Sequence, residues 1–282
     1  MDILLTGATG FIGSHVIKIA SEQKYNFLAI RRNELSQPKI KIKNNINWIS
    51  KELSKISKED IKNSDVLIHL AAHSANVPYD TLENCMHFNV YETLNFFNFA
   101  FNSGIRKFVV TGSCFEYGKK GEEYDFIPPD AALFPTQSYP ASKAAASLAL
   151  TQWALEKNVS LTILRLFQVY GEGELKTRLW PSLIINAKNG NDFKMTLGEQ
   201  IRDFIDVRDV AKIILSEANR QTNNRLTIRN IGSGKPTKLR DFASNVWEGL
   251  EGKGNILFGE VPYRDNEIMR YVPNIELEYT IK

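Results

Sequence analysis

A tyrosine and a lysine, Tyr139 and Lys143, stand four residues apart in the segment YPASK. On a helix this spacing places both side chains on one face. A free tyrosine has a pKa near ~10 and is a poor acid–base group at neutral pH, but an adjacent ammonium lowers that pKa by stabilising the phenolate. The pair is therefore suited to give a proton to a carbonyl oxygen while a hydride reaches the carbon, or to take one in reverse. Lys143 is also placed to bind a nicotinamide ribose.

A hydroxyl that suits the same reaction precedes this pair in the chain. The segment TGSCFEYG, residues 111–118, comes at the end of an apolar run that is typical of a buried strand. Ligands bind at the carboxyl ends of such strands in open α/β sheets. We therefore expect the hydroxyl of Ser113 to lie beside Tyr139 and to polarise the carbonyl. The alternative is a loop hydroxyl that only caps backbone groups.

A glycine-rich turn opens the chain. The apolar run 3–5 leads into Gly7, Gly10 and Gly13, and an apolar helical pattern follows. Strand, glycine turn and helix in this order are typical of the unit that holds the pyrophosphate of a dinucleotide. The free N–H groups and the positive dipole end of the helix favour a bound anion. A purely structural turn is the alternative.

The elements that must position these residues alternate along the first two-thirds of the chain. The apolar runs are rich in Val, Ile, Leu and Phe, as strands buried on both faces should be. Alternating strands and helices predict right-handed crossovers and an α/β fold with a doubly wound parallel sheet. We expect strands at 3–6, 27–30, 46–49, 66–70, 108–111 and 161–166, and helices at 11–23, 81–103 and 138–157.

The alternation weakens after Tyr170. We interpret residues 1–169 with about 204–222 as the dinucleotide-binding domain. Residues of about 170–203 with 223–282 are expected to form a smaller, interleaved C-terminal substrate-binding lobe. The expected elements of this part are helices at 180–188, 207–219 and 238–248 and strands at 203–205 and 225–230.

Composition limits the range of functions. The 282 residues are 43% hydrophobic and 24% charged, an ordinary globular composition, and the net charge of +3 is too small to indicate nucleic acid. No apolar run approaches the roughly 20 residues that span a membrane. A first strand at residue 2 or 3 leaves no room for a signal peptide, so we expect a cytoplasmic protein. The two cysteines and four histidines have no metal-ligand spacing, so no metal is expected.

Together these motifs resemble the extended short-chain dehydrogenases/reductases, within the NAD-dependent epimerase/dehydratase family. The resemblance covers nearly the whole chain. It implies a Rossmann-type sheet, a bound nicotinamide cofactor and the catalytic set Ser113, Tyr139 and Lys143. The matching segments, in order, are TGATGFIGSH, HLAA, FNV, TGSCFEYG, YPASK, LRLFQVYG, IRDFIDVRDVA and NIGSGKPTKLRDFA.

The resemblance also bears on the choice of cofactor. Members that use NAD commonly carry an acidic residue just after the second strand, where this chain has Arg31 and Arg32. Two guanidinium groups suit a 2′-phosphate, so NADP(H) is favoured and NAD(H) is possible; the alternative is two solvated arginines. Glu52 and Leu53 resemble the family's Asp-Leu contact with adenine. The other cofactor-binding residues that the resemblance implies are Gly7, Gly10, Phe11, Ile12, Gly13, Leu70, Ala71, Ala72, Tyr139, Lys143 and Phe167.

The residues after Ser113 restrict which of the family's reactions this chain resembles. The family's 4,6-dehydratases place Asp-Glu there, whereas this chain has Cys114 and Phe115. GDP-fucose synthases use a Cys/His pair for epimerisation, but Cys114 sits one place too early and no histidine follows Tyr170. The resemblance therefore favours an NADP-dependent reductase that acts at C4 of a nucleotide-linked 4-keto-6-deoxyhexose, in deoxysugar synthesis for surface polysaccharide. The alternatives are a nucleotide-sugar 4-epimerase with tightly bound NAD and, against the intact catalytic set, a non-catalytic dinucleotide-binding regulator.

Several residues are expected to hold the nucleotide sugar. Arginine forks match phosphate oxygens, which suits Arg178, Arg202 and Arg264 to the diphosphate, although each alone could be a surface arginine. The resemblance further implies a homodimer in which helices 81–103 and 138–157 of each subunit form a four-helix bundle. The other implied substrate-binding residues are His73, Ser113, Cys114, Phe115 and Gln168.

Overall fold

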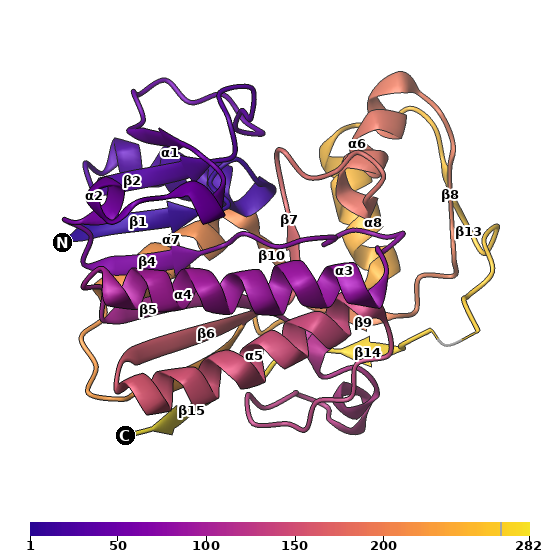
Figure 1. The fold of residues 1–282 in the computed structure, drawn as a ribbon. Coiled ribbons are helices and arrows are strands. Elements are labelled where there is room, and N and C mark those ends of the chain that lie inside the picture. Colours follow the sequence, from indigo (N-terminus) through magenta and orange to yellow (C-terminus); the bar gives the residue numbers. More distant parts are fainter. Residues whose placement is uncertain (266) are drawn as a thin grey trace.

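A central sheet of eight strands organises the molecule (Figure 1). The computed structural model describes residues 1–265 and 267–282. The strand order is β15-β11-β6-β5-β4-β1-β2-β3, and every neighbouring pair is parallel except β11 and β15, which are antiparallel. The strands are β1 (Asp2–Thr6), β2 (Asn26–Arg31), β3 (Trp48–Ser50), β4 (Val66–His69), β5 (Lys107–Ser113), β6 (Ser160–Leu166), β11 (Leu226–Ile231) and β15 (Glu278–Ile281).

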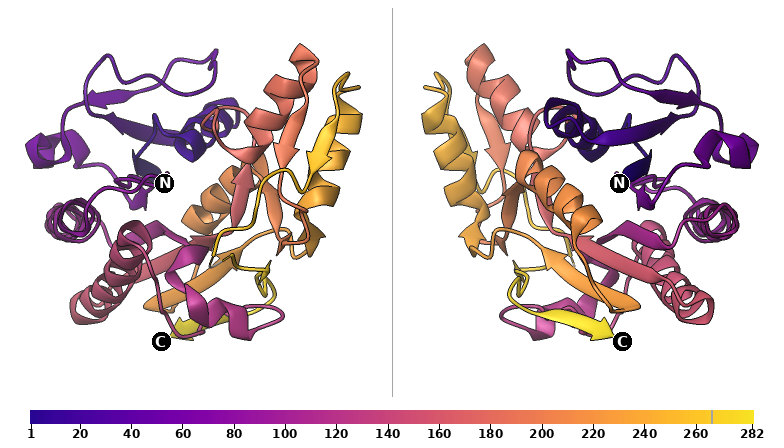
Figure 2. Two further views of the ribbon diagram at one scale, coloured as in Figure 1. Left: turned by 90° about the vertical axis from the view of Figure 1, so that its right-hand side faces the viewer. Right: turned by 90° about the vertical axis from the view of Figure 1, so that its left-hand side faces the viewer.

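Helices cover both faces of this sheet, as the two side views show (Figure 2). On one face, Leu5 of β1 packs in a cluster with residues of α1 (Phe11–Glu22) and α7 (Val207–Asn219). Its neighbour Leu4 points to the other face, into a cluster with α4 (Thr93–Asn102) and α5 (Ser138–Lys157). Apolar residues on both sides of one strand require this double covering, which confirms the expected doubly wound α/β fold. Among the helices of the described residues, none has the length and apolar character to cross a membrane.

The expected long helix 81–103 is interrupted. It consists of α3 (Leu82–Met86), the π-helical turn η2 (His87–Glu92) and α4. The wider turn places Asn89 in the interior, where its side chain is 5% exposed. There its amide accepts from the backbone N–H of His73 (2.7 Å) and donates to the hydroxyl of Ser142 (2.9 Å). Single π-turns inside helices are frequent at functional sites.

A smaller lobe stands beside the carboxyl edge of the sheet. Its core packs Leu183 and Ala187 of α6 (Leu179–Asn189) against Ala243 and Trp247 of α8 (Leu239–Gly249). The shorter elements outside the main sheet are β7 (Gln168–Tyr170) with β10 (Phe204–Asp206), β8 (Phe193–Met195) with β13 (Ile256–Phe258), β9 (Ile201–Arg202) with β12 (Thr237–Lys238) and β14 (Arg270–Tyr271), α2 (Lys58–Ile61), and the 3-10 turns η1 (Leu53–Lys55), η3 (Cys114–Glu116) and η4 (Lys119–Glu123).

Part of the segment 223–282 that was expected in the lobe lies instead in the main sheet. Strand β11 pairs with β6 along its whole length, and β15 closes that edge of the sheet. The reason is burial, since Leu226 and Thr227 are at most 1% exposed beside β6.

Candidate active site

The glycine turn fits a dinucleotide. Gly7 has a positive φ of 70°, and a Cβ there would lie 2.5 Å from the carbonyl carbon of Leu70. A Cβ on Gly13 would lie 2.1 Å from the carbonyl oxygen of Gly7, so neither position admits a side chain. At Gly10, by contrast, the nearest described atom to a Cβ is the oxygen of Gly7, at 3.1 Å. Gly10 is also the N-cap of α1 and supplies no side-chain cap, so the helix end can receive a phosphate.

Two arginines end strand β2 next to this turn. The Nε of Arg31 donates to the hydroxyl of Ser50 at 2.8 Å, and its guanidinium carbon lies 4.9 Å from the centre of the Trp48 ring. Arg32 is exposed. These contacts hold the Arg31 guanidinium at the sheet edge, whereas the Arg32 side chain is exposed to solvent. Close by in sequence, Glu52 pairs with Lys55 at 3.0 Å and Leu53 packs on the core.

The three expected catalytic residues are all buried. Ser113 is the last residue of β5 and is 8% exposed, and Tyr139 and Lys143 in α5 are 8% and 6% exposed. The ammonium of Lys143 donates to the carbonyl of Thr111 at 2.7 Å, which ties α5 to β5. The hydroxyl of Ser113 accepts from the N–H of Phe115 at 3.3 Å and retains its own proton to donate.

The pKa of Tyr139 moves in the direction opposite to the one expected from its spacing to Lys143. Burial raises the pKa of the phenol, and the charge of Glu116 adds to this effect. Burial also lowers the pKa of Lys143, opposed by Glu116. The physical reason is that the lysine bonds to the Thr111 carbonyl within an interior that disfavours charge. Tyr139 consequently holds its proton firmly.

A buried ion pair beneath Ser113 was not predicted. Glu116 and Arg165 are 0% and 4% exposed, and Nε of the arginine lies 2.9 Å from the carboxylate. The same carboxylate accepts from the N–H of Ser113 (2.7 Å) and the hydroxyl of Ser147 (2.7 Å). It thus links the carboxyl end of β5 to α5 and β6. The available signal was a single arginine inside the apolar run LTILRL.

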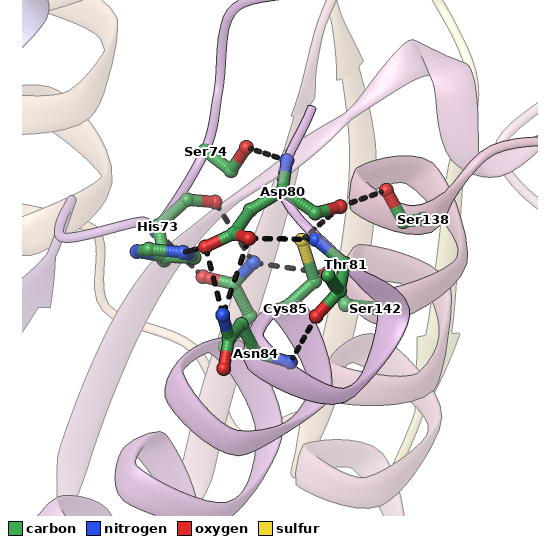
Figure 3. Close-up of polar contacts among 9 residues, drawn as sticks. His73, Ser74, Asp80, Thr81, Asn84, Cys85, Ser138 and Ser142 are labelled. Atoms are coloured by element: carbon green, nitrogen blue, oxygen red, sulfur yellow. Dashed lines mark hydrogen bonds and ion pairs between the residues drawn. The ribbon is translucent and has the colours of Figure 1, made fainter. Parts of the chain in front are cut away.

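The loop that follows β4 lies against the start of α5 (Figure 3). Nε2 of His73 lies 2.7 Å from the carboxylate of Asp80, and the carbonyl of Asp80 accepts from the hydroxyl of Ser138 at 2.7 Å. Next to Asp80, the ring of Tyr79 packs on that of Tyr139. Leu70, Ala71 and Ala72 connect β4 to this loop. The sequence singled out His73 here but neither Tyr79 nor Asp80.

The charges of the three arginines expected to bind the diphosphate affect the pKa values of Tyr79 and Cys114. Burial raises the pKa of Tyr79, and the positive charges of Arg178 and Arg264 oppose the shift. Burial likewise raises the pKa of the Cys114 thiol to about 12, opposed by Arg202 and Arg178. Such opposition requires the guanidinium groups to lie near these side chains. Tyr79 and Cys114 therefore both lie within range of the positive charges of these arginines.

Two of these arginines are already paired with carboxylates. Arg202, 13% exposed at its side chain, lies 3.1 Å from Glu267 and donates to the carbonyl of Ile268. Arg178 lies 3.4 Å from Glu174, whose second oxygen is buried with no hydrogen-bond partner among the described residues.

A small apolar cluster lies next to the end of β5 and includes Cys114. Cys114 is 2% exposed and Phe167 is 4% exposed, and both pack around Tyr271. Phe115 stacks on the same tyrosine, with 6.5 Å between ring centres. Gln168 is half-buried at the start of β7. The protonated, enclosed thiol of Cys114 is unsuited to acid–base chemistry at neutral pH.

The histidine nearest to Lys143 is structural. His69 is 3% exposed, and its Nδ1 lies 2.8 Å from the hydroxyl of Thr6. Burial lowers the pKa of this imidazole to about 3, and the charge of Lys143 contributes. In the part of the chain that the structure describes, His, Cys, Asp and Glu side chains form no group of three that could hold a metal ion.

Comparison with known proteins identifies the family of the chain. Residues 3–232 match the model of the "NAD dependent epimerase/dehydratase family". The chain belongs to this family. It is thus an NAD(P)-dependent enzyme of the oxidoreductase type, which confirms the resemblance seen in the motifs.

Relatives in the family cover nearly the whole chain. The CDP-abequose synthase of Salmonella muenchen is 28% identical over 272 residues, 95% of this chain and 87% of the relative. The dTDP-4-dehydro-6-deoxyglucose reductase of Escherichia coli is 28% identical, with 91% of this chain and 84% of the relative covered. The structure of a UDP-N-acetylglucosamine 4-epimerase from Methanobrevibacter ruminantium M1 superposes with a TM-score of 0.85 at 24% identity, over 98% and 89% of the two chains, and confirms the fold.

Proposed function

We propose that this enzyme reduces C4 of a nucleotide-linked 4-keto-6-deoxyhexose, in deoxysugar synthesis for surface polysaccharide. The observation that carries the proposal is the buried Tyr139, which holds a proton beside a region without the dehydratase carboxylates, since Cys114 and Phe115 follow Ser113. Two relatives point the same way, because one is named a CDP-abequose synthase and the other a 4-dehydro-6-deoxyglucose reductase.

The chain's own residues account for the proton transfer. A bound nicotinamide supplies the hydride for the reduction. The Ser113 hydroxyl donates a hydrogen bond to the keto oxygen, and Tyr139 Oη gives its proton to that oxygen as charge develops on it. Lys143, held by the carbonyl of Thr111, then stabilises the phenolate that remains. Ser113, Tyr139 and Lys143 are each at most 8% exposed, which limits their contact with water.

We assign the cofactor to the edge formed by β1, β2 and α1, with NADP(H) preferred over NAD(H). The turn of Gly7, Gly10 and Gly13 and the first residues of α1, Phe11 and Ile12, would hold the pyrophosphate. Arg31 and Arg32 stand where a 2′-phosphate would lie, and the contacts of Arg31 with Ser50 and Trp48 support it there. The remaining contacts are assigned to Glu52, Leu53, Leu70, Ala71, Ala72, Phe167, Tyr139 and Lys143.

We assign the diphosphate of the substrate to Arg178, Arg202 and Arg264, because their charges converge near Tyr79 and Cys114. The hexose then lies between the lobe and Tyr139, within reach of the loop that carries His73. Ser113, Cys114, Phe115 and Gln168 border this space from β5 and β7.

We also propose a homodimer through α3, η2, α4 and α5. Large apolar side chains are exposed along these helices: Phe88 is 46% exposed, Tyr91 59% and Leu148 64%. Exposed apolar side chains that gather on one face are typical of subunit interfaces. Two helical segments from each copy would form a four-helix bundle. The two buried cysteines, Cys85 and Cys114, are free thiols, as a cytoplasmic location would favour.

Nicotinamide absorbance tests the reaction class. The purified protein is mixed with NADPH, or separately NADH, and each of the dTDP-, CDP-, GDP- and UDP-linked 4-keto-6-deoxyhexoses. Oxidation with one nucleotide sugar, faster with NADPH, is the expected result. Absence of oxidation, together with interconversion of 4-epimeric nucleotide sugars without added cofactor, would identify a 4-epimerase with retained NAD instead.

A further inference from the structure

The side chain of Tyr79 covers the catalytic tyrosine. The two ring centres are 5.4 Å apart and the ring planes are tilted by 33°, a contact geometry that is favourable between aromatic rings. Tyr79 belongs to the loop between β4 and α3, so it reaches Tyr139 from a separate element. The two residues are far apart in sequence, and only the fold brings them together.

Asp80, the next residue, forms hydrogen bonds with residues at both ends of this loop (Figure 3). Its carboxylate accepts from Nε2 of His73 at 2.7 Å and from the backbone N–H of Thr81 at 2.7 Å. The side-chain amide of Asn84 donates to both carboxylate oxygens at 3.1 Å. The backbone N–H of Asp80 donates to the hydroxyl of Ser74 at 2.7 Å. Both ends of the loop are therefore fixed to one side chain.

The same residue fastens the loop to α5. The hydroxyl of Ser138 donates to the carbonyl of Asp80 at 2.7 Å, and Ser138 immediately precedes Tyr139 in the first turn of the helix. On the opposite side of the loop, Asn89 of η2 bonds to the backbone of His73 and to Ser142 of α5. Loop, π-turn and catalytic helix thus form one hydrogen-bonded unit.

We propose that residues 73–80 act as a clasp that fixes the ring of Tyr79 over Tyr139, so that Tyr79 and Asp80 are positioning residues for the catalytic tyrosine. The proposal deepens the function proposed above and rests on Tyr139 as the proton donor. The clasp would act by excluding water from one face of the Tyr139 phenol and by fixing the direction of its hydroxyl.

The clasp has a consequence for titration. Burial raises the pKa of Tyr139, and the groups that surround it are Glu116, Tyr79, Cys114 and Cys85, with Lys143 on the same face of α5. Removal of the Tyr79 ring admits water, so the pKa of Tyr139 should fall toward the ordinary tyrosine value of about 10. Because Tyr139 gives the proton, activity is present below its pKa, and the alkaline loss of activity should move to lower pH.

The first experiment needs no substrate. Tyrosinate absorbance is followed against pH for the full-length protein and for its Tyr139→Phe variant, and the difference isolates the titration of Tyr139. The same pair of measurements is made in Tyr79→Ala, Tyr79→Phe and Asp80→Ala backgrounds, with Tyr279→Ala, an exposed tyrosine of β15, as the control. Circular dichroism at each pH verifies the fold, and Tyr79→Leu replaces Tyr79→Ala if the latter does not fold.

The clasp predicts that Tyr79→Ala or Tyr79→Leu lowers the pKa of Tyr139 by about one unit or more, and that Asp80→Ala lowers it in the same direction. Tyr79→Phe keeps the ring and removes only the charge of the ionised hydroxyl, so it should lower this pKa less. Tyr279→Ala should leave it unchanged. An identical Tyr139 titration in the parent and the folded Tyr79 variants would overturn the proposal. A shift without turnover of any nucleotide sugar would retain the clasp and refute the proposed function, so the two failures are distinguishable.

Discussion

Tyr139 is the residue on which the proposed chemistry depends. Replacement by Phe removes the proton donor and preserves the buried ring that packs against Tyr79. We expect kcat to fall by roughly 10²–10⁴-fold, the usual contribution of a general acid, with little change in KM. Steady-state oxidation of the reduced nicotinamide gives both constants, and a variant as active as the parent would show that another group protonates the keto oxygen.

The arginines at the end of β2 determine cofactor preference in this account. Arg31→Asp combined with Arg32→Ala removes both positive charges and supplies a carboxylate for free ribose hydroxyls, so preference should move from NADPH toward NADH. The ratio of kcat/KM for the two cofactors measures this change. Arg32→Lys, which retains both positive charges, is the matched control. An unchanged ratio in the double variant would argue that both arginines serve only the fold.

Residue types pointed to the proposed catalytic residues but did not reveal the buried residues that hold them in place. The spacing of Tyr139 and Lys143 is local in sequence, so it can be detected without a structure. Tyr79 and the pair of Glu116 with Arg165 act through partners distant in sequence, and their types alone do not distinguish them from other surface or strand residues. The direction of the Tyr139 pKa was wrong for the same reason, because burial depends on the whole fold.

At the scale of elements, the ion pair of Glu116 and Arg165 joins η3, β6 and α5. Glu116→Gln leaves the buried guanidinium without its counter-charge and should lower the free energy of unfolding by roughly 3–5 kcal/mol. Denaturant unfolding measures this loss. Glu116→Gln with Arg165→Met removes both charges and should recover part of it. A single variant as stable as the parent would contradict the structural role of the pair.

Strand β9 carries Arg202, whose positive charge opposes the raised pKa of Cys114. Arg202→Ala should raise KM for the nucleotide sugar much more than KM for the cofactor, because only the diphosphate of the substrate is assigned to it. Arg270→Ala on the neighbouring strand β14 is the control, since Arg270 bonds instead to the carbonyl of Asp125. Equal changes in both KM values would assign Arg202 to the fold through its contact with Glu267.

Most elements could be predicted because buried parallel strands and amphipathic helices have strong patterns. The π-turn η2 could not, since an apolar helical pattern continues through residues 87–92 and nothing local marks the wider turn. The last strand, β15, was not predicted. β15 has the exposed sequence EYTI, which is not typical of a strand in the main sheet, and only its pairing with β11 puts it there.

At the scale of the whole molecule, the helical face of α3, η2, α4 and α5 is the proposed dimer interface. Tyr91→Glu with Leu148→Glu places charge in that face and should convert the dimer to a monomer. Light scattering during size-exclusion chromatography reports the mass. Leu35→Glu is the control, because Leu35 is 90% exposed and belongs to the loop between β2 and β3, outside the helical segments of the proposed interface. A parent protein that is monomeric at high concentration would contradict the interface.

The transfer of hydrogen to the sugar tests the central claim most directly. The enzyme is given NADPH deuterated at the reactive carbon of the nicotinamide and the nucleotide sugar that supports oxidation, and the product is analysed by mass spectrometry and NMR. The account predicts one deuterium per product, located at C4 of the hexose, and loss of this labelling in Tyr139→Phe. Product that forms without deuterium at C4 would contradict the reductase mechanism.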